Sequence, residues 1–143
     1  MALRFVSLFS IFVLAAATGC GGGGGGGSSS FAGTWAGSLF LVEDDCGLAE
    51  TQTLSVMHIV QQDGTNVVVD VLGGGSFRGT TVDDGKAFVV SSTDLNGNCV
   101  GASAIRYDRT ENGLAEVGLG FGASCGGGGL ECSVVYVGEL EKR

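Results

Sequence analysis

Residues that could perform acid–base chemistry are sparse in this 143-residue chain. His58 is the single histidine, and it alternates with Val56 and Val60, so it shares a predicted core face with them. A histidine in such a position is expected to be structural rather than a general base. The pairs Asp44–Asp45 and Asp83–Asp84 lie in predicted loops, where we expect solvated carboxylates. The sequence therefore predicts no enzyme, no metal site and no bound cofactor.

The first of the five cysteines, Cys20, follows a segment that is typical of an export signal. Arg4 supplies positive charge near the N-terminus, and residues 5–17 form an apolar run that only two serines interrupt. This run is shorter than the roughly 20 apolar residues of a permanent membrane-spanning helix. We therefore expect residues 1–19 to be a cleaved signal peptide.

The segment Ala17-Thr18-Gly19-Cys20 resembles the lipobox of bacterial lipoproteins. The resemblance implies that a diacylglyceryl group is attached to the sulfur of Cys20 and that the mature chain begins there. Each buried methylene contributes about 0.8 kcal/mol, so two or three lipid chains anchor a protein firmly in the bilayer. Gly21 stands where an aspartate would retain a lipoprotein at the inner membrane, which implies the outer membrane of the cell envelope if the host has one. The alternative is an ordinary secretory signal that leaves Cys20 as a free or paired thiol.

Residues 20–30 are predicted to form a flexible tether, because Cys20 is followed by seven glycines and three serines. Such a Gly/Ser chain spans about 17 Å on average. Residues 31–143 then suffice for one domain. Without residues 1–19 the chain has six Lys and Arg against fifteen Asp and Glu. This acidic balance argues against nucleic acid as a partner and favours solubility or a cationic partner.

Apolar and β-branched residues repeat with a period of two, which predicts an all-β domain. The expected strands are 33–42, 51–61, 65–72, 76–82, 86–92, 99–108, 114–122 and 131–140. Four dipeptides between them accept the positive φ angles of tight hairpins: Asp63-Gly64, Asp84-Gly85, Asn96-Gly97 and Asn112-Gly113. Consecutive hairpins predict a single eight-stranded antiparallel up-and-down β-barrel, in which closure removes both sheet edges. The alternative is an open β-sandwich.

An up-and-down barrel places alternate loops at opposite ends, and this separates short turns from long loops. The long segments 43–50, 73–75, 93–98 and 123–130 share one end with the four remaining cysteines. Because the last strand neighbours the first in a closed barrel, Cys46 is expected to pair with Cys132, and Cys99 with Cys125. Each disulfide in an exported domain adds about 2 to 4 kcal/mol of stability.

Polar residues of the long-looped end form the candidate rim for a ligand or a protein partner. They are Glu43, Asp44, Asp45, Asp94, Asn96 and Asn98. Segment 94–98 faintly resembles a calcium loop but lacks the distal glutamate of an EF-hand, so we expect a hairpin turn there. Since the tether and the C-terminus both leave from the short-turn end, the rim is expected to face away from the membrane.

At the start of the first strand, Gly33-Thr34-Trp35 resembles the Gly-x-Trp motif of the lipocalin and wider calycin group. The resemblance implies a small barrel that binds an apolar ligand at its open mouth. It also implies a basic residue, Lys142 or Arg143, over the ring of Trp35, which itself is expected to be a structural plug of the short-turn end.

Two main functional hypotheses follow. The first is a membrane-anchored lipoprotein whose lipocalin-like barrel binds a small apolar or amphipathic ligand. The second is a surface interaction or inhibitor lipoprotein whose acidic loops bind a cationic protein. A purely structural role in the envelope is a third alternative.

Overall fold

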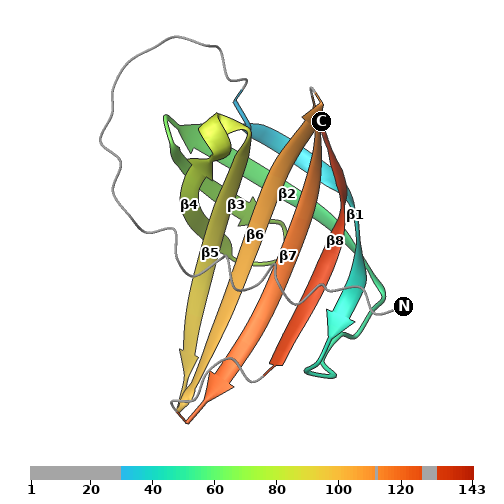
Figure 1. Cartoon of the computed structure of the whole chain (residues 1–143), viewed down its shortest axis with the longest axis vertical. Helices are drawn as coiled ribbons and strands as arrows, with labels where there is room; N and C mark the ends of the chain where they lie inside the picture. The colour runs from blue at the N-terminus through green and yellow to red at the C-terminus, as the bar shows by residue number, and fades with distance from the viewer. Residues whose placement is uncertain (1–29, 112, 127–131) are drawn as a thin grey trace.

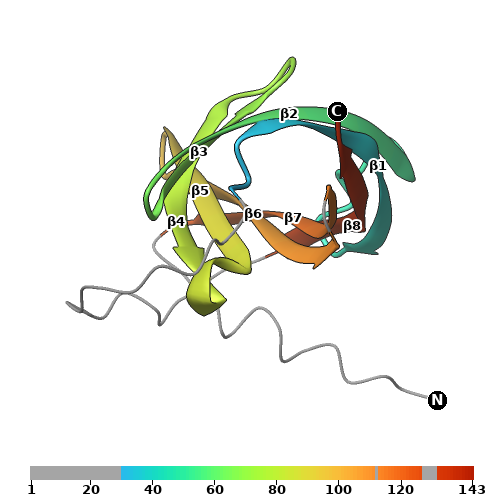
Figure 2. The ribbon, with the colours of Figure 1, turned by 90° about the horizontal axis from the view of Figure 1, so that it is seen from above.

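The computed structural model describes residues 30–111, 113–126 and 132–143, and these form a closed antiparallel β-barrel (Figures 1 and 2). The strands are β1 (Gly33–Asp44), β2 (Thr53–Asp63), β3 (Asn66–Val71), β4 (Ser76–Val82), β5 (Ala87–Asn96), β6 (Cys99–Glu111), β7 (Leu114–Cys125) and β8 (Cys132–Lys142). A short 3-10 helix, η1 (Asp83–Gly85), joins β4 to β5. Each strand pairs with its sequence neighbours, and β8 pairs with β1. The predicted barrel is confirmed, and the open sandwich is wrong. Cys20, the signal peptide and the tether up to residue 29 lie outside the described residues.

The predicted loop at 93–98 is wrong, because most of it is strand. β5 continues to Asn96, β6 begins at Cys99, and only residues 97–98 form the turn, with Gly97 at a φ of 61°. Side chains on β5 beyond Ser92 are exposed, so this part lacks the apolar alternation that identified the other strands. The β5–β6 hairpin and the end of β7 consequently extend beyond β8 at the long-looped end, which we call the open end (Figure 1).

The opposite end, which we call the closed end, is filled by aromatic side chains. Phe31 precedes β1 and inserts fully into the barrel, with its ring centroid 4.8 Å from that of Phe88. Phe88 stacks on Tyr107 at 4.4 Å, and the indole Nε1 of Trp35 donates a hydrogen bond of 2.7 Å to the carbonyl oxygen of Phe31. Trp35 is 1% exposed, in agreement with a plug. Sequence patterning did not identify Phe31 as part of this plug.

Two cations cover the aromatic plug. The Nζ atom of Lys142 lies 5.9 Å from the centroid of the Trp35 ring, so Lys142 rather than Arg143 takes the position that the lipocalin resemblance implies. The guanidinium of Arg109 lies closer to an aromatic ring, 4.2 Å above Phe31. Cation–π contacts of this kind add about 0.5 to 2 kcal/mol each, depending on solvation.

Glycines alternate with apolar residues along β7. Val117 and Leu119 are buried in the core, so Gly118 and Gly120 face the outside of the barrel. A Cβ atom at Gly118 would meet nothing within 4 Å. In contrast, a Cβ atom at Gly138 on β8 would clash with the carbonyl oxygen of Ser38. Glycine is therefore needed at Gly138, where β8 closes onto β1.

Candidate functional site

An apolar pocket of about 450 Å³ opens at the open end, between the β1–β2 loop and strands β7 and β8. Its apolar and aromatic walls come from Leu48, Ala49, Leu54, Phe121, Val134 and Tyr136. Phe121 lies on the same inward face as Leu119 but is 38% exposed, whereas Leu119 is 7% exposed. The packed core thus reaches Leu119, and the pocket begins beyond it at Phe121.

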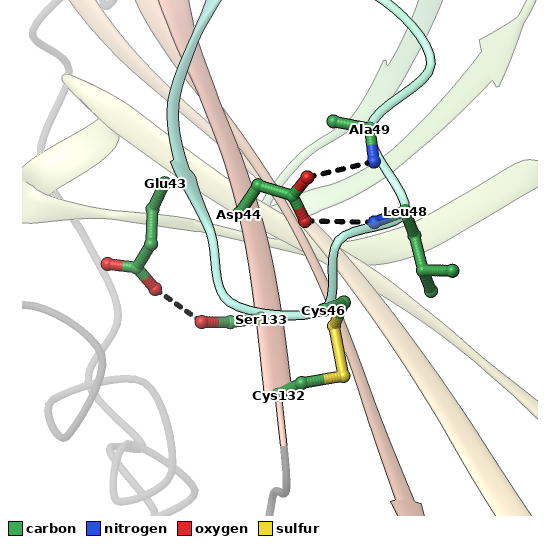
Figure 3. The surroundings of a disulfide bond; sticks show 7 residues. All are labelled: Glu43, Asp44, Cys46, Leu48, Ala49, Cys132 and Ser133. Atoms are coloured by element: carbon green, nitrogen blue, oxygen red, sulfur yellow. Dashed lines mark hydrogen bonds between the residues drawn. A yellow bond between two sulfur atoms is a disulfide. The ribbon is translucent and has the colours of Figure 1, made fainter.

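The β1–β2 loop that forms one wall is fixed from within (Figure 3). The two carboxylate oxygens of Asp44 accept hydrogen bonds of 3.1 Å from the backbone N–H groups of Leu48 and Ala49. The hydroxyl of Tyr136 donates to the carbonyl oxygen of Thr51 at 2.9 Å. These bonds pair backbone groups of three loop residues and hold this wall of the pocket in place.

The same loop is also attached to the start of β8. The Oγ atom of Ser133 donates to the Glu43 carboxylate, and the backbone N–H of Asp45 donates to the Ser133 carbonyl oxygen at 2.9 Å. The disulfide Cys46–Cys132 lies next to these bonds (Figure 3). It joins residues 86 positions apart, and the second disulfide, Cys99–Cys125, joins β6 to β7 across 26 positions. Both are the pairs that the barrel geometry predicts.

The six residues of the predicted rim all lie at the open end, but none of them lines the pocket. Glu43 and Asp44 stabilise the β1–β2 loop, and Asp45 is exposed beside them. Asp94 and Asn96 are exposed on the extended part of β5, and the carbonyl oxygen of Asn98 accepts a hydrogen bond from Gly126 N–H at 3.0 Å. Glu50 lines the pocket instead, and it is the one charged residue among the described lining residues.

His58 is fully buried in the barrel core and does not line the pocket. Its Nδ1 atom is 2.5 Å from the Tyr107 hydroxyl, and its Nε2 atom has no hydrogen-bond partner among the described residues. Burial lowers the pKa of His58 from 6.5 to about 4 and raises the pKa of Tyr107 above its ordinary range. Both side chains are therefore neutral near pH 7.

This buried histidine predicts a loss of stability in mild acid. The unfolded chain takes up a proton at His58 near pH 6.5, whereas the folded chain does so only near pH 4. The contribution of His58 to stability should therefore be constant above pH 6.5 and should fall by about 3 kcal/mol between pH 6.5 and pH 4. Urea unfolding as a function of pH measures this. His58→Gln keeps a polar partner for Tyr107 but cannot titrate, so its stability should fall less over this range; equal slopes would contradict the prediction.

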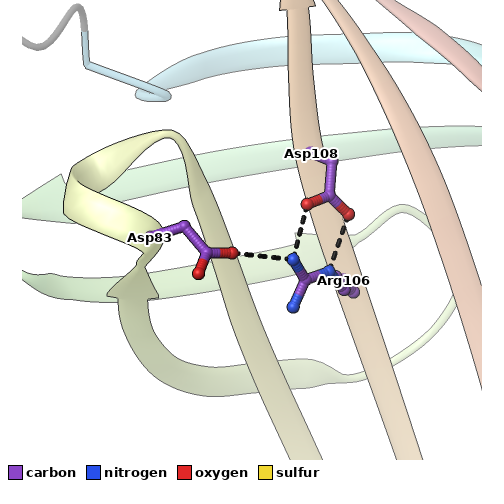
Figure 4. A network of polar contacts seen from close by, with 3 residues as sticks. All are labelled: Asp83, Arg106 and Asp108. Carbon is purple, nitrogen blue, oxygen red and sulfur yellow. Dashed lines mark hydrogen bonds and ion pairs between the residues drawn. The ribbon is translucent and has the colours of Figure 1, made fainter. Parts of the chain in front are cut away.

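A second polar cluster lies outside the barrel near the closed end (Figure 4). Arg106 donates to both carboxylate oxygens of Asp108, at 2.7 and 2.6 Å, and to Asp83 on η1 at 2.8 Å. The hydrogen bonds to Asp108 and then to Asp83 raise the pKa of Arg106 above its usual value. Asp83, expected to be a solvated loop carboxylate, thus forms an ion pair, although it stays 61% exposed. Pairs this exposed contribute little to stability.

Within residues 30–111, 113–126 and 132–143, no group of three or more His, Cys, Asp or Glu is arranged to hold a metal ion. The described part of the chain also has no helix that is long and apolar enough to span a bilayer. Comparison of the sequence with protein-family models and curated proteins, and of the fold with solved structures, found no match.

Proposed function

We propose that this barrel acts by binding, rather than by catalysis, and that its ligand is a small apolar or amphipathic molecule held in the open-end pocket. The observation that carries this proposal is the apolar pocket at the open end, on the side of the core that lies away from the aromatic plug. Its volume of about 450 Å³ falls within the usual range of small-molecule sites, roughly 300–1,000 Å³. Because the disulfide and hydrogen bonds already order the β1–β2 loop, little conformational entropy is lost on binding.

Filling the pocket is expected to weaken this binding strongly. Ala123 lines the pocket, so the indole of Ala123→Trp would occupy it, whereas Ala102 is exposed on the adjacent strand, opposite Gly122. We expect the neutral dye N-phenyl-1-naphthylamine to fluoresce on binding the wild type and Ala102→Trp, and to bind Ala123→Trp at least about tenfold more weakly. Thermal unfolding of both variants checks that they fold. Equal dye affinity in the two variants would exclude this pocket as the site.

We further propose that the chain is a lipoprotein of the cell envelope, in the outer membrane if the host has one, with its lipid on Cys20. The signal-like residues 1–19 and the lipobox-like Ala17–Cys20 support this. Ser30, the last residue of the predicted tether, lies at the closed end, where its hydroxyl donates to Gln62 at 3.3 Å. A tether that joins the barrel there would leave the pocket facing away from the bilayer. Mass spectrometry of the mature N-terminal peptide should find a diacylglyceryl group on Cys20; an unmodified Cys20 would reject the anchor.

One observation favours the alternative, a protein-binding role for the open end. Asp45, Glu50 and Asp94 are exposed there, and none of them has an ion-pair partner among the described residues. A cationic protein partner would contact these carboxylates and would not require the pocket. Such a partner should therefore bind Ala123→Trp as well as it binds the wild type.

A further inference from the structure

We infer that the open-end pocket selects amphiphiles with a positively charged head group and discriminates against fatty acids and other anionic amphiphiles. The inference rests on the proposed function, because it concerns the ligand of the same pocket. It is carried by the distribution of charge along the barrel axis and by the carboxylates beside the pocket.

Basic residues are concentrated at the closed end. Lys86, Arg109, Lys142 and Arg143 all lie at or next to the turns and termini of that end, and Arg106 is paired near it with Asp83. The remaining basic residue after the tether, Arg78, is the third residue of β4 and is exposed on the outside of the barrel, opposite Val68 of β3. Among the described residues, no Lys or Arg lines the pocket or lies in the β1–β2 loop or in the β5–β6 hairpin beyond Ser92, and the sequence of residues 127–131, Gly-Gly-Gly-Leu-Glu, adds none.

Carboxylates, in contrast, lie at the pocket and beside it. Glu50 belongs to the pocket lining, and Asp45, which is exposed in the same loop, precedes the lining residue Cys46. Neither carboxylate has a hydrogen-bond or ion-pair partner among the described residues, so both are available to a ligand. Glu43 and Asp44 add negative charge to the same loop while they hold it in place.

This arrangement favours one sign of ligand charge. An apolar tail would occupy the space between Leu54, Phe121 and Tyr136, which leaves the polar head at the mouth beside Glu50. A positively charged head group there is attracted by the Glu50 carboxylate. The low dielectric constant of the pocket wall makes this attraction stronger than it would be in bulk water. A carboxylate head would meet like charge and would find no basic side chain to pair with, and such repulsion is an effective source of specificity.

The test compares three ligands that have alkyl chains of nine or ten carbons and different head groups: decyltrimethylammonium, decanol and decanoate. Each displaces N-phenyl-1-naphthylamine from the full-length protein at pH 7.5 and low salt. We expect the cation to bind about tenfold more tightly than decanol, in keeping with two weak, solvent-accessible charge pairs, and decanoate to bind most weakly. The preference for the cation over decanol should decrease at high salt, because dissolved ions screen interactions between exposed charges over about 10 Å at 0.1 M.

A matched pair of double variants assigns the preference to particular residues. Asp45→Asn/Glu50→Gln should reduce the tenfold preference to about threefold or less. Asp63→Asn/Glu116→Gln removes the same charge from exposed positions in the closed half of the barrel and should leave the preference unchanged. Comparable dye affinity in both variants shows that the pocket is intact.

The possible outcomes separate the two proposals. If all three ligands displace the dye with equal affinity, the charge selection is wrong while binding by the pocket stands. If decanoate binds most tightly, the inference is also overturned. If neither the dye nor any of the three ligands binds, the proposed function fails together with the inference.

Discussion

Replacing both Cys46 and Cys132 by serine is expected to lower the free energy of unfolding by about 4 to 5 kcal/mol. The disulfide joins residues 86 positions apart, so its loss releases a long loop in the unfolded chain. This is a large part of the roughly 5–15 kcal/mol that stabilises a typical domain. Guanidinium unfolding of the oxidised protein and of the variant measures the difference.

The second disulfide is the matched control for this prediction. Cys99–Cys125 joins residues 26 positions apart, so Cys99→Ser/Cys125→Ser should cost about 3 to 4 kcal/mol, less than the first variant. The two variants should also differ in dye binding, because Cys46 lines the pocket and Cys99 and Cys125 do not. A larger loss of stability in the Cys99/Cys125 variant would contradict the loop-length argument.

Truncation of the aromatic plug by Phe31→Ala is expected to cost about 3 to 5 kcal/mol, the usual range for a buried phenylalanine. The Phe31 ring is fully buried against Phe88 and Tyr107 and lies under Arg109. Alanine would keep the backbone bonds of residue 31 to Gln62 and Trp35, so the variant isolates the ring. Equilibrium unfolding in urea measures the change.

Phe40→Ala serves as the comparison, because Phe40 is also an aromatic residue near the start of the domain but is 56% exposed on the outer face of β1. We expect this variant to lose no more than about 1 kcal/mol. If Phe31→Ala is as mild as Phe40→Ala, the segment before β1 does not plug the barrel in solution.

Strand order, closure and disulfide pairing could be predicted from the sequence because each depends on local patterns and on one geometric rule. Alternation identified the strands, and the Asp-Gly and Asn-Gly dipeptides identified the hairpins. Once β8 is assumed to meet β1, Cys46 and Cys132 must lie close together. Residues 93–96, at the end of β5, were predicted as a loop rather than as strand. Both faces of this part of β5 are exposed to solvent, so its polar residues show no apolar alternation.

The plug and the pocket could not be predicted in the same way. Phe31 precedes the first strand, so no alternating pattern assigns it to the core. The side chains of Leu119 and Phe121 both point into the barrel. The sequence does not reveal that Leu119 belongs to the packed core whereas Phe121 lines the pocket. The Asp44 hydrogen bonds to Leu48 and Ala49 depend on the path of the loop, which single-residue preferences do not determine.

The junction of β1 with β8 also bears on how the barrel folds. Trp35 pairs with Lys142 there, so the barrel closes through contacts between the two ends of the domain, which are entropically costly to form. The Cys46–Cys132 disulfide spans this junction. Once it has formed, the first and last strands can no longer diffuse apart, and closure becomes a local zippering step in an oxidised chain.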